Sequence, residues 1–385
     1  MYDLAVLGGG IVGRIAALSC KKEGKIILYD DKSDKLSTTK HPITIRAAHK
    51  PFLTKLGVWE CIEKKIQPIK RVNVSQKGHF GMITMSAKES PCEAIAYTVH
   101  FCDIYNALLA LTQDITLSNT SIKKVEKDNS MWRIVNSKDE ELVGASRLLI
   151  ADGAKAPLSK TLGWQAESYG PKIISFVYTI SNISALHQAA GQRFTKHYTY
   201  GIIPTKCQKQ YWLIMTMLEQ QQSVWEGLTK AEQQEQIQAD LGPMAMMMTI
   251  GKLYAKYPSK LQMRRYYSTP GVLGIGASYL SMPPVAAQGL NMALQNINTL
   301  ASLNIRHRWW EADPLHWQMQ YKKLVDTKTT QAFTHMRYWV DNHQQTNWWQ
   351  QVKRRIAWTY LGINGSIEDA LWIHGQGQNV VESKW

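Results

Sequence analysis

The chain has 385 residues, of which 44% are hydrophobic and 19% charged, and its net charge is +15 at pH 7. This composition excludes a disordered chain, and the length suits two domains better than one. No stretch reaches the 18 apolar residues that a membrane span requires, so we expect no transmembrane segment.

The charge of +15 allows three interpretations. Nucleic acid is not an expected partner, because the sequence has no RNP aromatic pattern, zinc finger or basic recognition helix. An anionic membrane surface stays open, since each well-placed cation contributes about 1 kcal/mol there. A basic surface that only aids solubility is the simplest interpretation of the charge alone.

The five cysteines are scattered, and the sequence has no CxxC, HxxxH or HExxH spacing. This pattern indicates reduced, packed thiols in a cytoplasmic protein and gives no reason to expect a metal site. Residues 1–7 already form a predicted strand, so we also expect no secretory leader before them.

The first thirty residues predict a β-α-β unit. An apolar strand at 2–7 leads into a glycine-rich turn and then a helix through Cys20, which two lysines close. A second strand at 25–29 ends at Asp30. About thirty residues is the usual size of such a unit.

Further elements follow from hydrophobic periodicity. Helices are predicted at 51–65 and 103–112, and strands at 71–86, 94–99, 120–126, 131–136 and 146–151. Long strands without helices at 172–181, 193–203 and 210–217 indicate an inserted antiparallel domain. Helices are expected over roughly 227–256 with a break near Gly242, then a strand at 270–276, a helix at 285–304 and a helical remainder at 315–385.

Gly8, Gly10 and Gly13 fit the GxGxxG motif between a strand and a helix. Glycine permits the tight turn, the approach of a pyrophosphate and the packing of the helix on the strand. The N-terminus of the helix then attracts the phosphate charge. Asp30 lies 20 residues after Gly10, where a carboxylate binds ribose hydroxyls in such folds. The motif therefore predicts a dinucleotide site.

A second helix N-terminus is predicted far downstream. Asp152 and Gly153 follow a buried strand, and a segment near Gly276 precedes the run Pro-Val-Ala-Ala-Gln-Gly-Leu-Asn from Pro284 to Asn291. This run of small residues opens a helix, so bare backbone amides are available to an anion or a carbonyl. An ordinary loop and cap is the alternative.

The order of these features resembles the group A flavin-dependent aromatic hydroxylases, and among them the ubiquinone-biosynthesis hydroxylases of polyprenylated phenols. Leu-Gly-Val-Trp at 56–59, Tyr97-x-Val99, Pro204 and Trp212 add to the resemblance, which covers nearly the whole chain. It implies FAD as cofactor, NAD(P)H as reductant and transfer of one oxygen atom from O2 to an aromatic ring. The sequence itself assigns no catalytic residue.

By this resemblance, the FAD site takes its residues from four parts of the chain. The pyrophosphate, the adenosine ribose, the flavin and its chain are expected at Gly8, Gly10, Ile11, Val12, Gly13, Asp30, Val99, Asp152, Gly276, Pro284, Gln288, Gly289, Leu290 and Asn291. The backbone amides at 288–290 would face the pyrimidine end of the flavin.

The resemblance implies an α/β fold: a Rossmann-like FAD-binding domain with an inserted antiparallel β-sheet substrate domain and a helical C-terminus. We expect the FAD-binding domain at 1–75, 98–165 and 265–330, the substrate domain at 76–97 and 166–264, and the helical C-terminal region at 331–385.

Several positions depart from the family pattern. Ala277 replaces the aspartate that binds the ribityl chain, Leu280 replaces a histidine, and Ala287 replaces a glycine. The family arginine between the second strand and the next helix falls near His41. Losing one charged hydrogen bond weakens binding by about 1.5–3 kcal/mol. A non-catalytic relative that binds lipid quinone precursors or biosynthesis proteins, and a flavin oxidoreductase of another aromatic, therefore remain alternatives.

Other features bear on partners. Nine of the 14 tryptophans lie between Trp309 and Trp385, among cations such as Arg306, Arg308, Lys322, Lys323, Lys353, Arg354 and Arg355. This region is compatible with peripheral attachment to the inner face of the cytoplasmic membrane, or with helix packing. The methionines at 244–248 are interpreted as core filler, Arg264 and Arg265 as structural or surface residues, and His197 and Tyr200 as strand-face residues.

Overall fold

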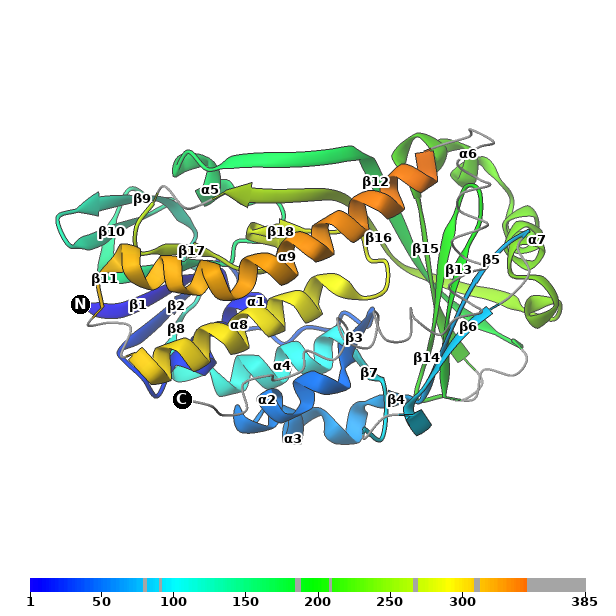
Figure 1. Cartoon of the computed structure of the whole chain (residues 1–385), viewed down its shortest axis with the longest axis horizontal. Helices are drawn as coiled ribbons and strands as arrows, with labels where there is room; N and C mark the ends of the chain where they lie inside the picture. The colour runs from blue at the N-terminus through cyan, green and yellow to red at the C-terminus, as the bar shows by residue number, and fades with distance from the viewer. Residues whose placement is uncertain are drawn as a thin grey trace.

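The computed structural model describes residues 1–344 except 79–81, 90–91, 184–187, 208–209, 266–268 and 308–311. Figure 1 shows two parts side by side: a sheet covered by helices around the N-terminus, and a larger sheet that carries its own helices on the far side. This arrangement confirms the predicted α/β class with a second sheet, which is antiparallel except where β13 pairs in parallel with β5.

The first sheet contains the predicted β-α-β unit. Strand β1 (Tyr2–Leu7) lies between β2 (Ile26–Tyr29) and β11 (Glu141–Ile150), and all three are parallel. β11 also pairs in parallel with β17 (Val272–Gly274). The sheet is completed by β8 (Thr116–Leu117), β9 (Ile122–Asp128) and β10 (Met131–Asn136).

Helices α1 (Ile11–Cys20), α4 (Phe101–Leu111) and α8 (Gln288–His307) pack together beside this sheet, and α1 contacts both of the others. The core side of α1 is made of small and branched residues that fit closely against β1. The predicted helix at 51–65 is divided into α2 (Lys50–Lys55) and α3 (Val58–Ile62), because Gly57 adopts a left-handed φ of 72°.

The large sheet has the strand order β18-β16-β12-β15-β14-β13-β5-β6. Its members are β5 (Arg71–Gln76), β6 (Met82–Ser86), β12 (Gln165–Ser181), β13 (Ala189–Phe194), β14 (Thr199–Pro204), β15 (Gln210–Leu218), β16 (Thr249–Arg265) and β18 (Leu280–Ser281). One face packs on α6 (Gln222–Gly227) and α7 (Lys230–Leu241), around Trp225 and Ile237. Trp212 lies on the opposite face, because it alternates along β15 with Leu213 of that cluster.

A small sheet and several short elements complete the fold. The small sheet has the order β3-β7-β4, with β3 at Pro42–Arg46, β7 at Ala96–His100 and β4 at Gln67–Ile69. The short elements are α5 (Pro157–Thr161) and the 3₁₀ turns η1 (Ala47–His49), η2 (Glu63–Lys65), η3 (Ala87–Glu89), η4 (Gln113–Ile115), η5 (Glu219–Gln221), η6 (Gly242–Ala245) and η7 (Gly276–Ser278).

Three sequence predictions in the large sheet are wrong. The strand expected at 71–86 is two strands, β5 and β6, which pair antiparallel with each other. The strand expected at 193–203 is two strands, because the Thr195 hydroxyl accepts the N–H groups of His197 and Tyr198 and closes a turn. The helix expected to run on to residue 256 is replaced from Thr249 by β16. This segment pairs with β12 over its full length, and such long-range pairing overrides local periodicity.

The methionine stretch was only partly predicted. Met248 is buried, as core filler should be, but Met246 and Met247 are 72% and 78% exposed. They lie in the connection between η6 and β16, where the chain leaves the helical layer to enter the sheet. The interpretation as core filler is therefore wrong for these two.

Helix α9 (Pro314–Gln344) contacts both β12 and β16 and runs along the molecule in Figure 1. The Tyr169 hydroxyl donates to Asp341 at 2.5 Å, and Arg337 lies over the Tyr169 ring. In the described part of the chain, no helix combines the length and apolar character needed to cross a membrane. The predictions for residues 345–385 lie outside the described residues.

Candidate functional site

The glycine-rich turn has the geometry that the motif predicts. Gly8 has a φ of 122°, and a Cβ atom there would lie 2.4 Å from the Ala151 carbonyl oxygen. A Cβ at Gly13 would lie 1.9 Å from the Gly8 oxygen. At Gly10, by contrast, the space that a Cβ would occupy is open. Two glycines thus allow close packing, and the third leaves space for a ligand.

The N-terminus of α1 begins at this open position. Its N-cap residue, Gly10, is exposed and provides no side-chain cap. The first amides of a helix have no intrahelical partner, so those of Ile11, Val12 and Gly13 are available to an anion.

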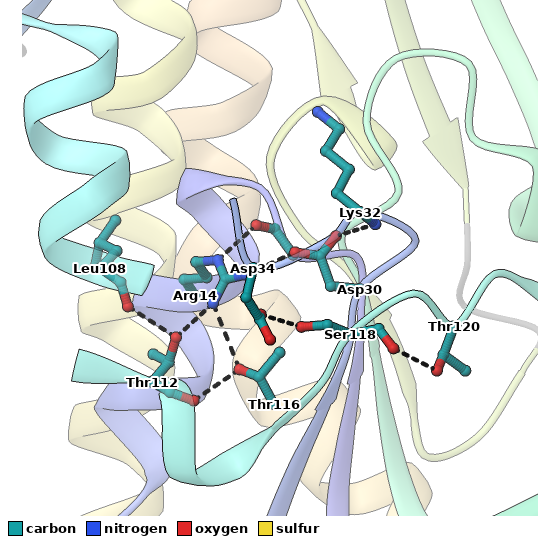
Figure 2. Close-up of polar contacts among 10 residues, drawn as sticks. Arg14, Asp30, Lys32, Asp34, Leu108, Thr112, Thr116, Ser118 and Thr120 are labelled. Atoms are coloured by element: carbon teal, nitrogen blue, oxygen red, sulfur yellow. Dashed lines mark hydrogen bonds and ion pairs between the residues drawn. The ribbon is translucent and has the colours of Figure 1, made fainter. Parts of the chain in front are cut away.

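Asp30 lies at the end of β2 as predicted, but its surroundings were not predicted. Its side chain is 1% exposed and accepts a hydrogen bond from Arg14 at 2.6 Å and one from the Lys32 backbone N–H at 3.1 Å. The Arg14 side chain is completely buried. It also donates to the Thr112 and Thr116 hydroxyls, as Figure 2 shows. The carboxylate thus belongs to a buried ion pair.

Sequence reasoning missed Arg14. The available signal was a charged residue directly after the third glycine, on a helix whose neighbouring positions Ile15, Ala16 and Ala17 are apolar. A charge at such a position is buried, and a buried charge needs a partner. In the structure that partner is Asp30, at the end of the second strand of the unit.

A cavity of about 370 Å³ adjoins this ion pair. The Tyr105 ring forms part of its wall and also faces the Arg14 guanidinium, 5.4 Å from ring centre to carbon. The remaining wall combines hydroxyls, two lysines and a second aromatic ring: Lys32, Ser33, Lys35, Ser37, Thr39 and Phe101. Such a wall suits a polar, anionic ligand with an aromatic group.

The chain around Gly276 is brought to the start of α1. Gly276 has a φ of 60°, and a Cβ there would lie 2.8 Å from a Val12 methyl carbon. The carbonyls of Ala277 and Ser278 accept hydrogen bonds from Arg264, which also donates to Ala154. Arg264 is therefore a buried structural clamp, in agreement with one of its two predicted roles.

Asp152 lies beside this clamp. Its carboxylate accepts the Leu158 N–H at 2.9 Å and thereby caps α5. Burial raises the pKa of Asp152, while the hydrogen bonds from Leu158 and Ser278 and the charge of Arg264 act in the opposite direction. Asp152 and Gly276 thus meet in one region, although they come from distant parts of the chain.

The turn before α8 contains two non-glycine residues with left-handed backbone, Ala286 with φ 53° and Ala287 with φ 51°. Pro284, Gly289 and Leu290 are half-buried around it. The Gln288 side-chain oxygen is buried and has no hydrogen-bond partner among the described residues. An orphaned acceptor at a helix start is a feature that a donor-bearing ligand would satisfy.

Asn291 acts as a latch between α8 and β3. Its amide donates to the Thr44 and Ala287 carbonyls at 2.9 and 2.7 Å, and its oxygen accepts the Arg46 N–H at 2.8 Å. The side chain is therefore engaged within the protein. Any contact that Asn291 makes with a cofactor would have to come from its backbone.

His49 is buried beneath this latch. Burial, reinforced by the charge of Arg46, lowers its pKa to about 4, against a smaller opposing effect of a hydrogen bond to the Asn291 backbone. The imidazole is consequently neutral at physiological pH.

Val99 is buried in β7, opposite Ile43 of β3. The ring of the next residue, His100, lies edge-on to the ring of Trp212 in the large sheet, with 5.8 Å between the ring centres. The rings of Trp212 and Tyr254 are also edge-on, with 4.9 Å between their centres. Tyr200 lies on the other face of that sheet, where its hydroxyl donates to Asp240 at 2.8 Å. The prediction that His197 is a strand-face residue is wrong, because it lies in the turn between β13 and β14 that the Thr195 hydroxyl closes.

One group of metal-ligand atoms occurs in the described part of the chain, His100, Cys102 and Asp103, within 4.8 Å of one another. His100 is the N-cap of α4, Cys102 and Asp103 lie on the first turn of this helix, and Asp103 pairs with Lys65 at 3.1 Å. This group therefore has a structural explanation.

The residues present fit FAD. The open, uncapped N-terminus of α1 suits its pyrophosphate, and the orphaned Gln288 oxygen suits a donor of the flavin ring. The described residues therefore offer partners to both ends of the cofactor.

Comparison with known proteins agrees with this geometry. Residues 1–305 match the family model described as FAD binding domain. The ubiquinone hydroxylase UbiM of Neisseria meningitidis is 23% identical over 322 residues, which cover 78% of this chain and 68% of that protein.

Two solved structures have the same fold. The p-nitrophenol 4-monooxygenase PnpA of Pseudomonas putida has a TM-score of 0.76 at 13% identity, covering 99% of both chains. A single-residue variant of HpxO from Klebsiella pneumoniae, complexed with FAD, has a TM-score of 0.75 at 14% identity, covering 98% of this chain and 99% of that one. The chain therefore belongs to the FAD binding domain family, and it shares its fold with these two proteins.

Proposed function

We propose that the chain uses FAD, NAD(P)H and O2 to hydroxylate the aromatic ring of a polyprenylated phenol in ubiquinone biosynthesis. The observation that carries this proposal is the contact between His100 and Trp212. It brings the large sheet against the residue that follows Val99, which is the predicted flavin neighbour. A ring bound on that face of the sheet would thus lie next to the flavin.

The geometry supports the following assignment of cofactor contacts. The Gly8–Gly13 turn and the N-terminus of α1 would hold the pyrophosphate, Asp30 the ribose, and Asp152 with Gly276 the ribityl chain. The Pro284–Asn291 segment would hold the flavin ring through its backbone and the Gln288 side chain. FAD, when bound, would supply the redox chemistry between NAD(P)H and O2.

Trp212 is our candidate for substrate recognition. Its indole N–H is buried and has no hydrogen-bond partner among the described residues. Leaving such a donor unpaired costs about 1–3 kcal/mol, so an oxygen of the substrate would be stabilised there. Tyr254, at 41% exposure, offers an aromatic edge toward solvent. The similarity to UbiM supports a quinone precursor as the ring.

The test begins with the purified protein. A yellow protein that oxidises NADPH faster when a prenylated phenol is added, and that transfers ¹⁸O from ¹⁸O2 to the ring, would support the proposal. Stimulation by soluble aromatics alone would favour a flavin oxidoreductase of another substrate. A Trp212→Phe variant should raise the KM for the phenol while FAD binding stays unchanged.

The replacement of the family acid by Ala277 favours a second candidate, a non-catalytic relative that binds lipid quinone precursors or other biosynthesis proteins. This candidate predicts a colourless protein that takes up no FAD on titration yet still binds a prenylated phenol. FAD uptake with turnover would exclude it.

The net charge of +15 supports a further part of the proposal, peripheral attachment to the inner face of the cytoplasmic membrane. Attraction of this kind is screened by salt. Co-sedimentation with anionic liposomes at low salt that vanishes at high salt would support it, and no binding at low salt would contradict it.

A further inference from the structure

We propose that Arg14 is a positioning residue of the pyrophosphate site, where it fixes the Gly9–Gly10 peptide so that the Gly10 amide faces the bound diphosphate. This inference rests on the proposed function in one respect: the chain must bind the adenosine diphosphate half of FAD at the Gly8–Gly13 turn.

The first step is the hydrogen bond from Arg14 Nε to the Gly9 carbonyl oxygen, at 2.8 Å. A trans peptide is planar, and its C=O and N–H groups point in opposite directions. Because the Gly9 carbonyl faces Arg14, the Gly10 N–H of the same peptide faces away from it. Gly10 is exposed, and the space at its Cβ position is open. One hydrogen bond thus sets the direction of an amide at the ligand side.

The Arg14 guanidinium is itself held in one position by its other hydrogen bonds. One terminal nitrogen donates to Asp30 at 2.6 Å, and the other to the Thr112 hydroxyl at 2.7 Å and the Thr116 hydroxyl at 3.4 Å. Both threonine hydroxyls give their own hydrogens to backbone carbonyls, so their oxygens accept from Arg14. Figure 2 shows this network joining α1, the end of β2 and the chain after α4.

The charge of Arg14 contributes little to the attraction of the ligand. Arg14 is paired with Asp30 inside the protein, so the two charges largely cancel as seen from the ligand. General attraction of phosphate is therefore a small part of its role. What Arg14 supplies is direction, since five donors in a fixed plane can hold a carbonyl and a carboxylate at once.

The experiment compares ADP with adenosine as probes of the full chain, by calorimetry and ligand-observed NMR. Arg14→Met should weaken ADP binding roughly tenfold or more, as expected for loss of an oriented donor to a charged group. Adenosine, which lacks the phosphates, should change less than about threefold. Arg14→Lys keeps the charge but not the planar fork, and should give an intermediate loss for ADP.

The double variant Arg14→Met/Asp30→Asn separates direction from charge and from stability. It has the same net charge as the original chain and leaves no unpaired buried ion, so its melting temperature should recover relative to Arg14→Met. The ratio of ADP to adenosine affinity should remain low. Tyr200→Phe, on the far face of the large sheet, is the matched control that loses a buried hydrogen bond without changing ADP binding.

A folded Arg14→Met or double variant that binds ADP as tightly as the original chain would overturn the role of Arg14. Equal weakening of ADP and adenosine in Arg14→Met would also overturn it, because that result indicates collapse of the whole site. If the original chain binds neither ADP nor FAD, the proposed function fails and this inference fails with it.

Discussion

The two ends of the candidate FAD site are built on one plan, a tight turn that opens a helix, yet they differ in how their backbones are accommodated. At α1 the left-handed position is occupied by Gly8, which adopts it without strain. At α8 the two left-handed positions are occupied by Ala286 and Ala287, at a cost of about 1–2 kcal/mol each. The first turn is relaxed, and the second is held in place by its surroundings.

The side chains that fix these two turns also differ. The α1 end is fixed by the buried Arg14–Asp30 pair, whereas the α8 end is fixed by the neutral amide of Asn291. The α8 end also lacks the acid that the family carries at Ala277. If the chain binds FAD as proposed, its affinity for the adenosine half is built into the fold, whereas its affinity for the flavin half depends on a few replaceable contacts.

Gly13→Ala should disrupt the turn at the α1 end of the site and have the largest effect on stability and FAD binding. Its new Cβ would lie 1.9 Å from a backbone oxygen, which cannot move aside. We expect a loss of at least about 3 kcal/mol in unfolding free energy and no detectable FAD binding. Gly10→Ala is the matched variant: it should keep the original melting temperature, because the space is open, and lose FAD affinity. Equal stability of the two variants would contradict the described turn.

Acid should destabilise the protein at the α8 end of the site, through protonation of His49. Its pKa is about 4 when folded and 6.5 when unfolded, so only the unfolded chain binds this proton between these values. Stability therefore rises with pH across that window and is lost as the pH falls through it, by roughly 3 kcal/mol in total. Urea unfolding at about pH 7 and about pH 4.5 should show a smaller acid loss in His49→Gln. An identical loss in both proteins would show that His49 is not the cause.

Restoring the family acid with Ala277→Asp should strengthen FAD binding at the α8 end of the site. The turn carrying this residue is held by Arg264 through backbone carbonyls, so a new side chain leaves it in place. One charged hydrogen bond to the ribityl chain should tighten FAD binding by about 1.5–3 kcal/mol, or roughly tenfold to 150-fold. Ala277→Asn, the neutral control, should gain less. Fluorescence titration with FAD measures both, and no gain with Asp would place the ribityl chain elsewhere.

Relieving the backbone strain at Ala286 and Ala287 should have the smallest effect on stability. Ala286→Gly and Ala287→Gly should each raise the unfolding free energy by about 1 kcal/mol, because glycine adopts a positive φ freely. Ala293→Gly, inside α8, should instead lower it by about 1 kcal/mol. Thermal unfolding compares the three variants, and a destabilised Ala287→Gly would show that the turn is not strained.

Sequence was most informative where local chemistry decides the structure. The β-α-β unit, the glycine turn and the position of Asp30 follow from spacing alone, since each depends on neighbouring residues. The helices predicted over roughly 227–256 fail from Thr249 onward, because β12 supplies the partner for β16 from a distant part of the chain. Periodicity contains no information about such a partner.

The same reasoning explains what was missed within the site. Asn291 was predicted to contact the flavin, but its amide is used by Thr44 and Arg46, which lie nearly 250 residues earlier. Arg14 was overlooked because its partners Thr112 and Thr116 come from another part of the chain. Side-chain networks across elements are set by tertiary packing, so a motif names the positions but not their neighbours.

The strand order of the first sheet has a consequence for synthesis on the ribosome. β1 emerges first, but its neighbour β11 ends at residue 150, and β17, which borders β11, ends only at residue 274. At about 5–20 residues per second, β11 would wait roughly 6 to 25 seconds for that last strand. During this interval β11 exposes an apolar edge, the kind of surface that chaperones protect. A ribosome-bound chain stopped before residue 272 should therefore be more sensitive to protease than one extended past α8.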